Sequence, residues 1–478
     1  MMRTPSIKPA VAVLAGALTL GACSTFSPDG GMSVAANVAE QELHKEVVAI
    51  RTQDDASSAR ARVQHLLKRP LTADTAVQIA LLNNRGLQAA YNELGIAESV
   101  RMQQSLPPNP SFSISRISGS VETEIASQIV GNIIALATLP VRAEIATDRF
   151  RQAQLFAALE TLRVAGKTRR VFYRAVTARQ QVDLLTQANS AAATTTQLAK
   201  RLGETGAMNK LDQAREQVFY ADLTAQLASA RQRATSAREE LIRSLGLWGS
   251  DLAFTLPNSL PALPKRPRTL PAVEQEAVSH RVDLQIARIE LETLAKSYGL
   301  TKATRFINVL EAGYADKVTT SKETGEQIRD RGFTVTFEAP LFDFGETRHR
   351  EAEQIYMQVV NRLAEKAINV RSEARDRYQN YRSAYDIAAH YQREVLPLRK
   401  IISDEMILRY GAMQVDVFPL LIEARQRIAA NAAAVEAQRN FWLASTDLSA
   451  AINGGGGAVN GEETSNMTIS RASDATGH

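Results

Sequence analysis

The side chains that most often carry chemistry are scattered along this sequence. Six histidines are present, and no two of them stand at metal-ligand spacing beside a cysteine or a carboxylate cluster. They are His44, His65, His280, His349, His390 and His478. No Gly-x-Ser-x-Gly motif, phosphate-binding loop or dinucleotide-binding glycine motif occurs either. The sequence therefore predicts no catalytic centre, no cofactor and no metal site, and it argues against an enzyme.

The only cysteine, Cys23, stands in a special position. Arg3 and Lys8 precede an apolar run from Ala10 to Leu20, and two small residues then lead to the cysteine. A basic start and an apolar run too short to span a bilayer, which takes ~20 residues, are typical of a secretory signal. We expect residues 1–22 to be removed. The alternative is an ordinary signal peptide with an incidental cysteine behind it.

The charge balance excludes one class of partner. Removing Arg3 and Lys8 leaves 56 − 2 = 54 basic against 51 acidic side chains, so the formal charge falls from +5 to +3. Charges of both signs spread along helices form a solvated surface rather than a nucleic-acid site. No internal segment approaches ~18 uninterrupted apolar residues, so we expect no transmembrane helix. Any route through a membrane would then use strands.

The two halves of the chain share one order of elements. Residues 72–247 and 272–453 each predict a short apolar helix, two alternating segments, and two long amphipathic helices that meet at a tight turn. Residues 84–90 also resemble residues 281–287 in sequence. A repeat of this length indicates duplication of half a protein. The remaining parts are an N-terminal segment (23–71), a linker with five prolines (248–271) and a tail expected to be disordered (454–478).

The long helices are expected at 142–201 and 346–410, each followed by a return helix that ends near Leu247 or Ile452. At 1.5 Å per residue the first would be about 90 Å long. Helices of this length normally bury a narrow seam against neighbours, as coiled coils do. Pro397 should kink the second long helix.

The alternating segments are expected at about 109–119, 126–139, 305–316 and 331–342, each near the ~9–11 residues that a tilted membrane strand needs. Phe333, Val335 and Phe337 alternate with polar residues, which suits a wall between lipid and water. The expected polar side of this wall carries Ser113, Gln128, Asn132, Asn308, Thr334, Thr336 and Glu338. The alternative is a soluble sheet with one wet face.

Four membrane strands in one chain cannot close a barrel, because known bacterial barrels have at least ~8 strands. An open sheet edge in lipid would also leave backbone groups without hydrogen bonds. If these strands cross a membrane, the barrel must be shared among chains.

Taken in order, these motifs resemble those of TolC-type outer-membrane efflux lipoproteins over essentially the whole mature sequence. The motifs are Leu20-Gly21-Ala22-Cys23, Leu71-Thr72 before Asn84-Arg85-Gly86-Leu87, Leu106-Pro107-Pro108-Asn109-Pro110-Ser111, His280-Arg281-Val282-Asp283-Leu284, Pro340-Leu341-Phe342-Asp343-Phe344-Gly345 and Arg409-Tyr410-Gly411. Arg85 and Val282 depart from the family pattern, which commonly has proline there. The first copy also lacks the aromatic-glycine ending of the second.

The resemblance implies a mainly α fold with a membrane β-barrel portion. Long antiparallel coiled-coil helices would form a periplasmic α-barrel, and a homotrimer would share one β-barrel built from four strands per protomer. It further implies cleavage before Cys23, a covalent lipid on Cys23 as the only attached group, and, from Ser24, sorting to the outer membrane.

The function implied is that of a passive duct in a tripartite efflux pump. A periplasmic adaptor protein and an inner-membrane pump would feed it with small toxic compounds or metal ions. Two alternatives stay open, which are the duct of a type I protein secretion system and a non-conducting coiled-coil lipoprotein of the envelope.

The resemblance also places a narrow gate at the periplasmic mouth. The residues implied are Asp416 and Glu423 as a ring of carboxylates, with Phe418 and Pro419 as an apolar constriction. Ordinary solvated acids near a helix N-terminus are the alternative. At the helix turns, Arg201, Gly203, Arg409 and Gly411 are candidates for adaptor contact, whereas simple capping of the helix C-termini is the alternative for both arginines.

Overall fold

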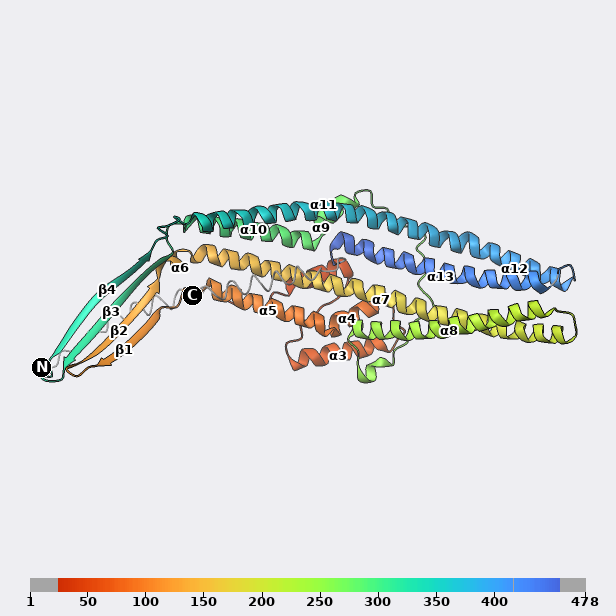
Figure 1. The fold of residues 1–478 in the computed structure, drawn as a ribbon, viewed down its shortest axis with the longest axis horizontal. Helices are drawn as coiled ribbons and strands as arrows, with labels where there is room; N and C mark the ends of the chain where they lie inside the picture. Colours follow the sequence, from red (N-terminus) through yellow and green to blue (C-terminus); the bar gives the residue numbers. More distant parts are fainter. Residues whose placement is uncertain (1–24, 416, 456–478) are drawn as a thin grey trace. The chain divides into compact units, whose positions relative to one another are not determined.

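The computed structural model describes residues 25–415 and 417–455 (Figure 1). They divide into two compact units. The strand unit comprises the described residues of Met1–Val34 together with Tyr91–Ala157 and Leu284–Ala367, and the hairpin unit comprises Ala35–Ala90, Ala158–Asp283 and the described residues of Ile368–His478. The expected signal peptide (1–22), Cys23, and the expected tail beyond Gly455 lie outside the described residues.

The elements follow the chain in the duplicated order that the sequence predicts. The helices are α2 (Ser33–Val38), α3 (Gln53–Leu67), α4 (Ala73–Asn83), α5 (Arg85–Ser105), α6 (Ile133–Ala137), α7 (Leu139–Glu204), α8 (Lys210–Leu245), α9 (Val273–His280), α10 (Val282–Ala303), α11 (Glu346–His390), α12 (Leu396–Gly411) and α13 (Val417–Asn453). The strands are β1 (Ser111–Ser118), β2 (Glu122–Asn132), β3 (Val309–Ser321) and β4 (Gln327–Glu338). Short π segments occur at η2 (Ala39–Leu43) and η4 (Tyr391–Val395), and a 3-10 turn at η3 (Gly249–Leu252).

The first helix of each repeat is interrupted at the same position. Thr72 caps α4 through a capping box with Thr75, as its position in the sequence predicts. The chain is then extended for one residue, at Asn84 (φ −69°, ψ 115°) between α4 and α5 and at Arg281 (φ −63°, ψ 115°) between α9 and α10. The sequence predicts one unbroken helix at each place. This break at equivalent positions supports duplication more directly than the similarity in sequence does.

The long helices differ in how regular they are. Helix α7 has 66 residues, which corresponds to about 100 Å at 1.5 Å per residue, and Pro140 is accommodated because it lies in the first turn. In the second repeat the expected kink at Pro397 takes the form of η4, a π turn between α11 and α12. Proline cannot donate to the carbonyl four residues earlier, and the wider turn accommodates the mismatch.

The strands of the strand unit form one antiparallel sheet in the order β1-β2-β3-β4. The predicted segment 126–139 is wrong at both ends, since β2 begins at Glu122 and residues 133–137 are helical. The Asn132 side chain explains the early end, because it caps α6 by accepting a hydrogen bond from the Ala135 amide (2.8 Å). Strands β3 and β4 are likewise shifted by about four residues from the predicted segments, in opposite directions along the chain.

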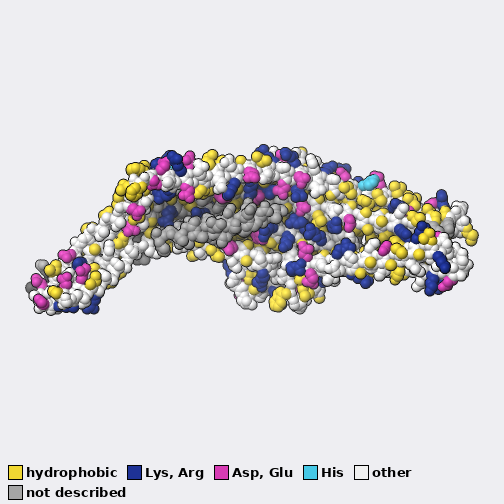
Figure 2. All heavy atoms as spheres, viewed as in Figure 1, with side chains coloured by type: hydrophobic (Ala, Val, Ile, Leu, Met, Phe, Trp, Pro, Cys, Tyr) yellow, Lys and Arg dark blue, Asp and Glu magenta, His cyan; other side chains and the backbone are white. Residues whose placement is uncertain are grey.

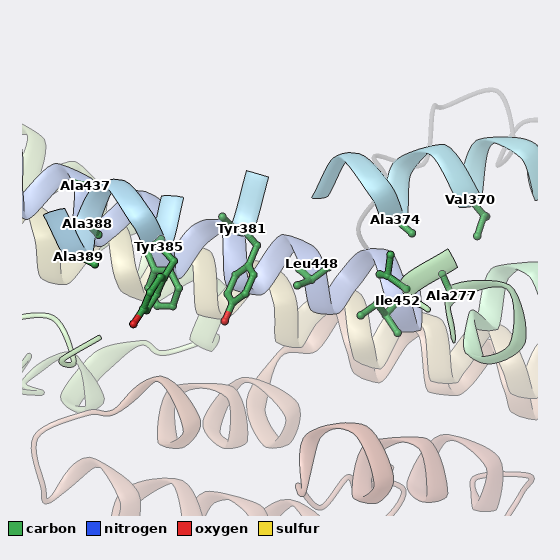
Figure 3. Packing of buried hydrophobic residues seen from close by; sticks show 13 residues of the cluster. Ala277, Val370, Ala374, Tyr381, Tyr385, Ala388, Ala389, Ala437, Leu448 and Ile452 are labelled. Carbon is green, nitrogen blue, oxygen red and sulfur yellow. The ribbon is translucent and has the colours of Figure 1, made fainter. Parts of the chain in front are cut away.

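In the hairpin unit a hydrophobic cluster lies between α11 and α13, where Tyr381, Tyr385 and Leu448 are buried (Figure 3). The tyrosine hydroxyls also fasten the proline-rich linker. The Tyr381 hydroxyl accepts from the Arg268 amide (3.0 Å), and the Tyr385 hydroxyl donates to the Pro264 carbonyl (3.1 Å). The tyrosines therefore provide hydrogen-bond partners for part of the linker backbone, which takes part in no strand pairing within the described residues.

Candidate functional site

The sheet separates its side chains by chemistry. Ser113 pairs with Gln128, and Glu311 pairs with both Asn132 and Thr336. Cross-strand partners share a face and alternate residues of a strand share a face, so these pairings define one side of the sheet, here called the polar face. Of the residues predicted to line a lumen, Ser113, Gln128, Asn132, Thr334, Thr336 and Glu338 lie on the polar face.

Asn308, the remaining predicted lumen residue, lies just before β3. Its side-chain amide donates to the Glu338 carboxylate (3.3 Å), so it extends the edge of the polar face from outside the strand. The assignment of these residues to a channel lumen stays a prediction.

The polar face is strongly acidic. Within the strands it carries the carboxylates of Glu122, Glu124, Glu311, Asp330 and Glu338 and the single ammonium of Lys317, a net charge of 1 − 5 = −4. Lys317 pairs with Glu124 (2.9 Å). Of these acids, the sequence analysis assigned only Glu338 to the polar side. It began the second strand too late to include Glu122 and Glu124 and the fourth too late to include Asp330, and it assigned no face to Glu311. The sequence did contain the information, because Glu122 and Glu124 stand an even number of residues from Gln128 and would share its face in one strand.

The opposite side, here called the apolar face, carries large exposed hydrophobic residues. They are Phe112, Ile114, Ile125, Ile129, Tyr314, Phe333, Val335 and Phe337, and half-buried Leu310 lies on the same face. Phe333 is 87% exposed and packs its edge against Tyr314 at 5.5 Å between ring centroids. Within the described residues, nothing covers this exposed apolar side of the sheet, and an exposed apolar surface of this kind indicates contact with a partner or with lipid.

The two edges of the sheet are unpaired as well. In the described residues β1 pairs only with β2, and β4 pairs only with β3. Each outer edge therefore presents a row of backbone donors and acceptors, which is the template for pairing with another strand.

At the turn of the second helical hairpin, Glu423 of α13 is 5% exposed and accepts a hydrogen bond from Arg399 of α12 (3.0 Å). Arg399 also donates to Gln426, and Arg425 pairs with Glu216 of α8 (2.6 Å) while lying over the Phe219 ring. Glu423 thus ties the two arms of its hairpin together. To contribute to the predicted carboxylate ring it must first leave Arg399.

The other predicted gate residues are less informative. Asp416 and the side chain of Phe418 lie outside the described residues, and Pro419 is half-buried in the first turn of α13. The gate therefore stays a prediction.

Replacing Glu423 by glutamine should lower the free energy of unfolding by about 1–3 kcal/mol, because the buried Glu423 side chain then loses its charged hydrogen bond with the half-buried Arg399 guanidinium. The measurement is the thermal midpoint of the purified protein in detergent. Glu405→Gln is the matched control, since Glu405 forms an exposed ion pair with Arg409 one turn away on the same helix, and such pairs are worth under ~1 kcal/mol. An unchanged midpoint together with a raised channel conductance for Glu423→Gln would favour the ring instead.

The residues predicted to contact an adaptor lie at the two hairpin turns. Arg201 is exposed in the last turn of α7, and Gly203 follows it one residue before the helix ends. Arg409 is exposed and pairs with Glu405 (2.8 Å), and Gly411 is the last residue of α12. Both arginines are therefore placed to meet a partner and to offset the helix dipole, so adaptor contact stays a prediction.

The described residues contain neither a metal-binding cluster nor a membrane-spanning helix. None of their His, Cys, Asp and Glu side chains form a group of three or more that could hold a metal ion. No helix in the part of the chain that the structure describes is long and apolar enough to cross a bilayer.

Comparison of the folded chain with solved structures identifies its class. The crystal structure of CusC matches with a TM-score of 0.66, covering 80% of this chain and 92% of that one at 16% identity. The open state of the MtrE outer membrane channel of Neisseria gonorrhoeae also gives 0.66, covering 83% and 89% at 15% identity. The protein has the fold of TolC-type outer-membrane channels, and the predicted fold class is confirmed.

Comparison by sequence adds one relative. The cobalt-zinc-cadmium resistance protein CzcC of Cupriavidus metallidurans is 26% identical over 246 residues, which cover 50% of this chain and 56% of the relative. The match thus spans about half the length of that protein. No family model matches the sequence.

Proposed function

We propose that this protein is the outer-membrane channel of a tripartite efflux pump, a passive duct that carries its cargo across the outer membrane. The observation that carries the proposal is the two-faced sheet, whose register puts acidic and small polar residues on one side and exposed aromatic and aliphatic residues on the other. Only a wall between water and lipid accommodates both sides. The similarity in fold to outer-membrane channels supports the same conclusion.

The channel would be a trimer. Four strands with two open edges require strands from other chains. The resemblance to TolC-type channels implies three copies, whose 3 × 4 = 12 strands exceed the ~8 of the smallest barrels. The helices have surface to bury as well, because hydrophobic side chains are exposed along the hairpin helices among lysines and arginines (Figure 2), including Leu398, Ile401 and Leu408 of α12. Neighbouring copies would cover these side chains.

A lipid on Cys23 would anchor the mature chain to the outer membrane. A periplasmic adaptor would meet the hairpin turns near Arg201 and Arg409, and an inner-membrane pump would supply the energy. The channel itself then needs neither a bound cofactor nor catalysis.

The cargo that the sheet suits best is cationic, and we infer metal ions ahead of other small toxic compounds. A net charge of −4 per polar face would surround the lumen of a trimer with acidic groups, which raises the local concentration of cations. The name of the relative CzcC refers to resistance to cobalt, zinc and cadmium, which supports the same class of cargo.

The test is conductance and ion selectivity in planar bilayers. The wild-type protein should form channels that prefer cations. The combined replacements Glu122→Gln, Glu124→Gln, Glu311→Gln and Asp330→Asn should lower the cation-to-anion permeability ratio several-fold, because they remove most of the lumen charge. Asp316→Asn, which removes a carboxylate from the apolar face of the same sheet, should leave the ratio unchanged. A protein that never conducts would favour the envelope tether, and equal effects of both variants would refute the assignment of faces.

A further inference from the structure

The apolar face has one charged end. Arg116 of β1 and Arg329 of β4 lie in the same row across the sheet, and Arg331 lies in the next row together with Asp316. These four residues form what we call the arginine rim. The rim lies toward the turns that join β1 to β2 and β3 to β4, at the end of the sheet remote from the helices (Figure 1).

Asp316 holds Arg329 and Arg331 in place but neutralises only part of the positive charge of the rim. Asp316 receives both Nε and Nη2 of Arg329, with Nε to Oδ1 at 2.8 Å, and its Oδ2 lies 3.5 Å from Nε of Arg331. Arg329 and Arg331 remain 55% exposed, whereas Asp316 is 16% exposed. Within the described residues Arg116, which is exposed on β1, forms no ion pair. The rim therefore carries a net charge of 3 − 1 = +2 with free guanidinium donors directed outward.

The position of the rim along the sheet fits a membrane surface. Successive residues on one face of a strand are ~6.6 Å apart, and a strand tilt of about 40° reduces this to roughly 5 Å along the membrane normal. The exposed apolar side chains of Phe333, Val335 and Phe337 then cover about 10 Å of this direction within β4, which is part of the ~25 Å apolar band of an outer-membrane barrel. Arg331 and Arg329 lie just beyond these apolar side chains.

That placement decides the partner of the arginines. An arginine at the middle of the bilayer costs about 2–4 kcal/mol, but near the interface the cost falls to about 0–1 kcal/mol. At headgroup height the anionic groups available are phosphates, and a planar guanidinium binds phosphate through two parallel hydrogen bonds. Closing a barrel would also place β1 of one copy beside β4 of the next, so that arginines from two copies meet at each seam.

We propose that the arginine rim binds the phosphate groups of phosphorylated lipids in the leaflet that the strand turns reach. This proposal rests on the proposed function, because it requires the apolar face to meet lipid. In the assembled barrel the arginine rim would hold anionic lipid at the seams between copies, a role separate from that of the lumen.

The experiment measures the thermal midpoint of the purified full-length protein in a neutral detergent as diphosphoryl lipid A is added. A ligand that binds only the folded state raises the midpoint with its concentration. The midpoint should rise with diphosphoryl lipid A, and rise little with phosphatidylcholine or with inorganic phosphate at the same concentration. The combined replacements Arg116→Gln, Arg329→Gln and Arg331→Gln should abolish the rise, and Lys317→Gln, which removes a cation from the polar face of the same strands, should preserve it.

Bilayer conductance of the same samples separates this proposal from the proposed function. The arginine variant should conduct as the wild type does, since its changes lie away from the lumen. A wild-type midpoint that does not respond to diphosphoryl lipid A, or responds equally to inorganic phosphate, would overturn the lipid site while conduction persists. An equal rise in the arginine variant would overturn it as well. Absence of conduction by the wild type would instead refute the channel.

Discussion

Replacing Gly345 by alanine should destabilise the strand unit by about 3 kcal/mol or more. Gly345 joins β4 to α11 with φ +70°, a conformation that costs an L residue about 1–2 kcal/mol. A Cβ there would stand 2.3 Å from the backbone carbonyl oxygen of Arg305, so the joint between α10 and β3 must also move. That carbonyl belongs to the backbone and cannot rotate away, and forced shifts of this kind cost about 1–3 kcal/mol more.

The damage should extend to assembly, because Arg305 links the two connections of this repeat. Its Nε donates to the Phe344 carbonyl (2.8 Å), and its Nη2 pairs with Glu346 (2.6 Å) at the start of α11. Moving Arg305 would therefore release β3 and β4 from the helices that position them. The measurement is the thermal midpoint in detergent together with the fraction of protein that migrates as an oligomer on a non-denaturing gel.

Gly325 provides the matched control for this prediction. It has φ +71° in the turn between β3 and β4, but a Cβ at that position meets nothing within 4 Å. Gly325→Ala should therefore cost only the backbone term of about 1–2 kcal/mol and should leave oligomers intact. If the two variants behaved alike, the contact with Arg305 would have no energetic weight, and the joint would be more adaptable than its geometry indicates.

The two-faced sheet could be predicted from the sequence because alternation is a local property. The alternation of Phe333, Val335 and Phe337 with polar residues has a period of two, which no helix has. The observed register places the apolar residues on one face and Thr334, Thr336 and Glu338 on the other, as expected. The helical hairpins were predictable for a similar reason, since a proline-free amphipathic stretch has few alternatives to a helix. The duplication then fixed the order of the elements.

The ends of the strands could not be predicted, because they depend on competition between neighbouring structures. Asn132 has the alternation of a strand residue, yet its side chain caps α6, so the apolar residues after it become helical. At the equivalent place in the second repeat, Phe344 and Gly345 turn the chain through positive φ values instead. The same joint is thus built in two ways, which is why the aromatic-glycine ending occurs only once in the sequence.

The arginine rim and most of the polar-face acids escaped prediction for a different reason. Which charges lie together is set by cross-strand register, and register depends on where each turn begins. Arg116 and Arg329 are more than two hundred positions apart, and only the pairing through Ile125 and Val318 puts them in one row. A periodic pattern within one strand contains no information about its partner.

Replacing Arg281 by methionine should lower the stability of the hairpin unit by about 3–5 kcal/mol, the cost of breaking a buried ion pair from one side. Arg281 is the extended residue between α9 and α10, and only 8% of its side chain is exposed. It bonds Asp283 (2.9 Å) and Glu373 (2.6 Å) and donates to the Ala451 carbonyl (3.3 Å), so one guanidinium joins α10, α11 and α13. Burial alone would lower the pKa of Arg281, but the two carboxylates raise it, so this side chain stays charged.

Arg375→Met is the control that separates burial from charge. Arg375 lies on α11 and, like Arg281, pairs with a carboxylate, Glu274 at 3.1 Å, but 56% of its side chain is exposed, so its loss should cost under ~1 kcal/mol. The measurement is the thermal midpoint, read beside protease resistance of the hairpin unit. Arg281→Lys should fall between the two, because an ammonium keeps the charge but cannot reach all three acceptors from one rigid fork. Equal midpoints for Arg281→Met and Arg375→Met would contradict this prediction, because they would mean that Asp283 and Glu373 regain enough water to replace the guanidinium.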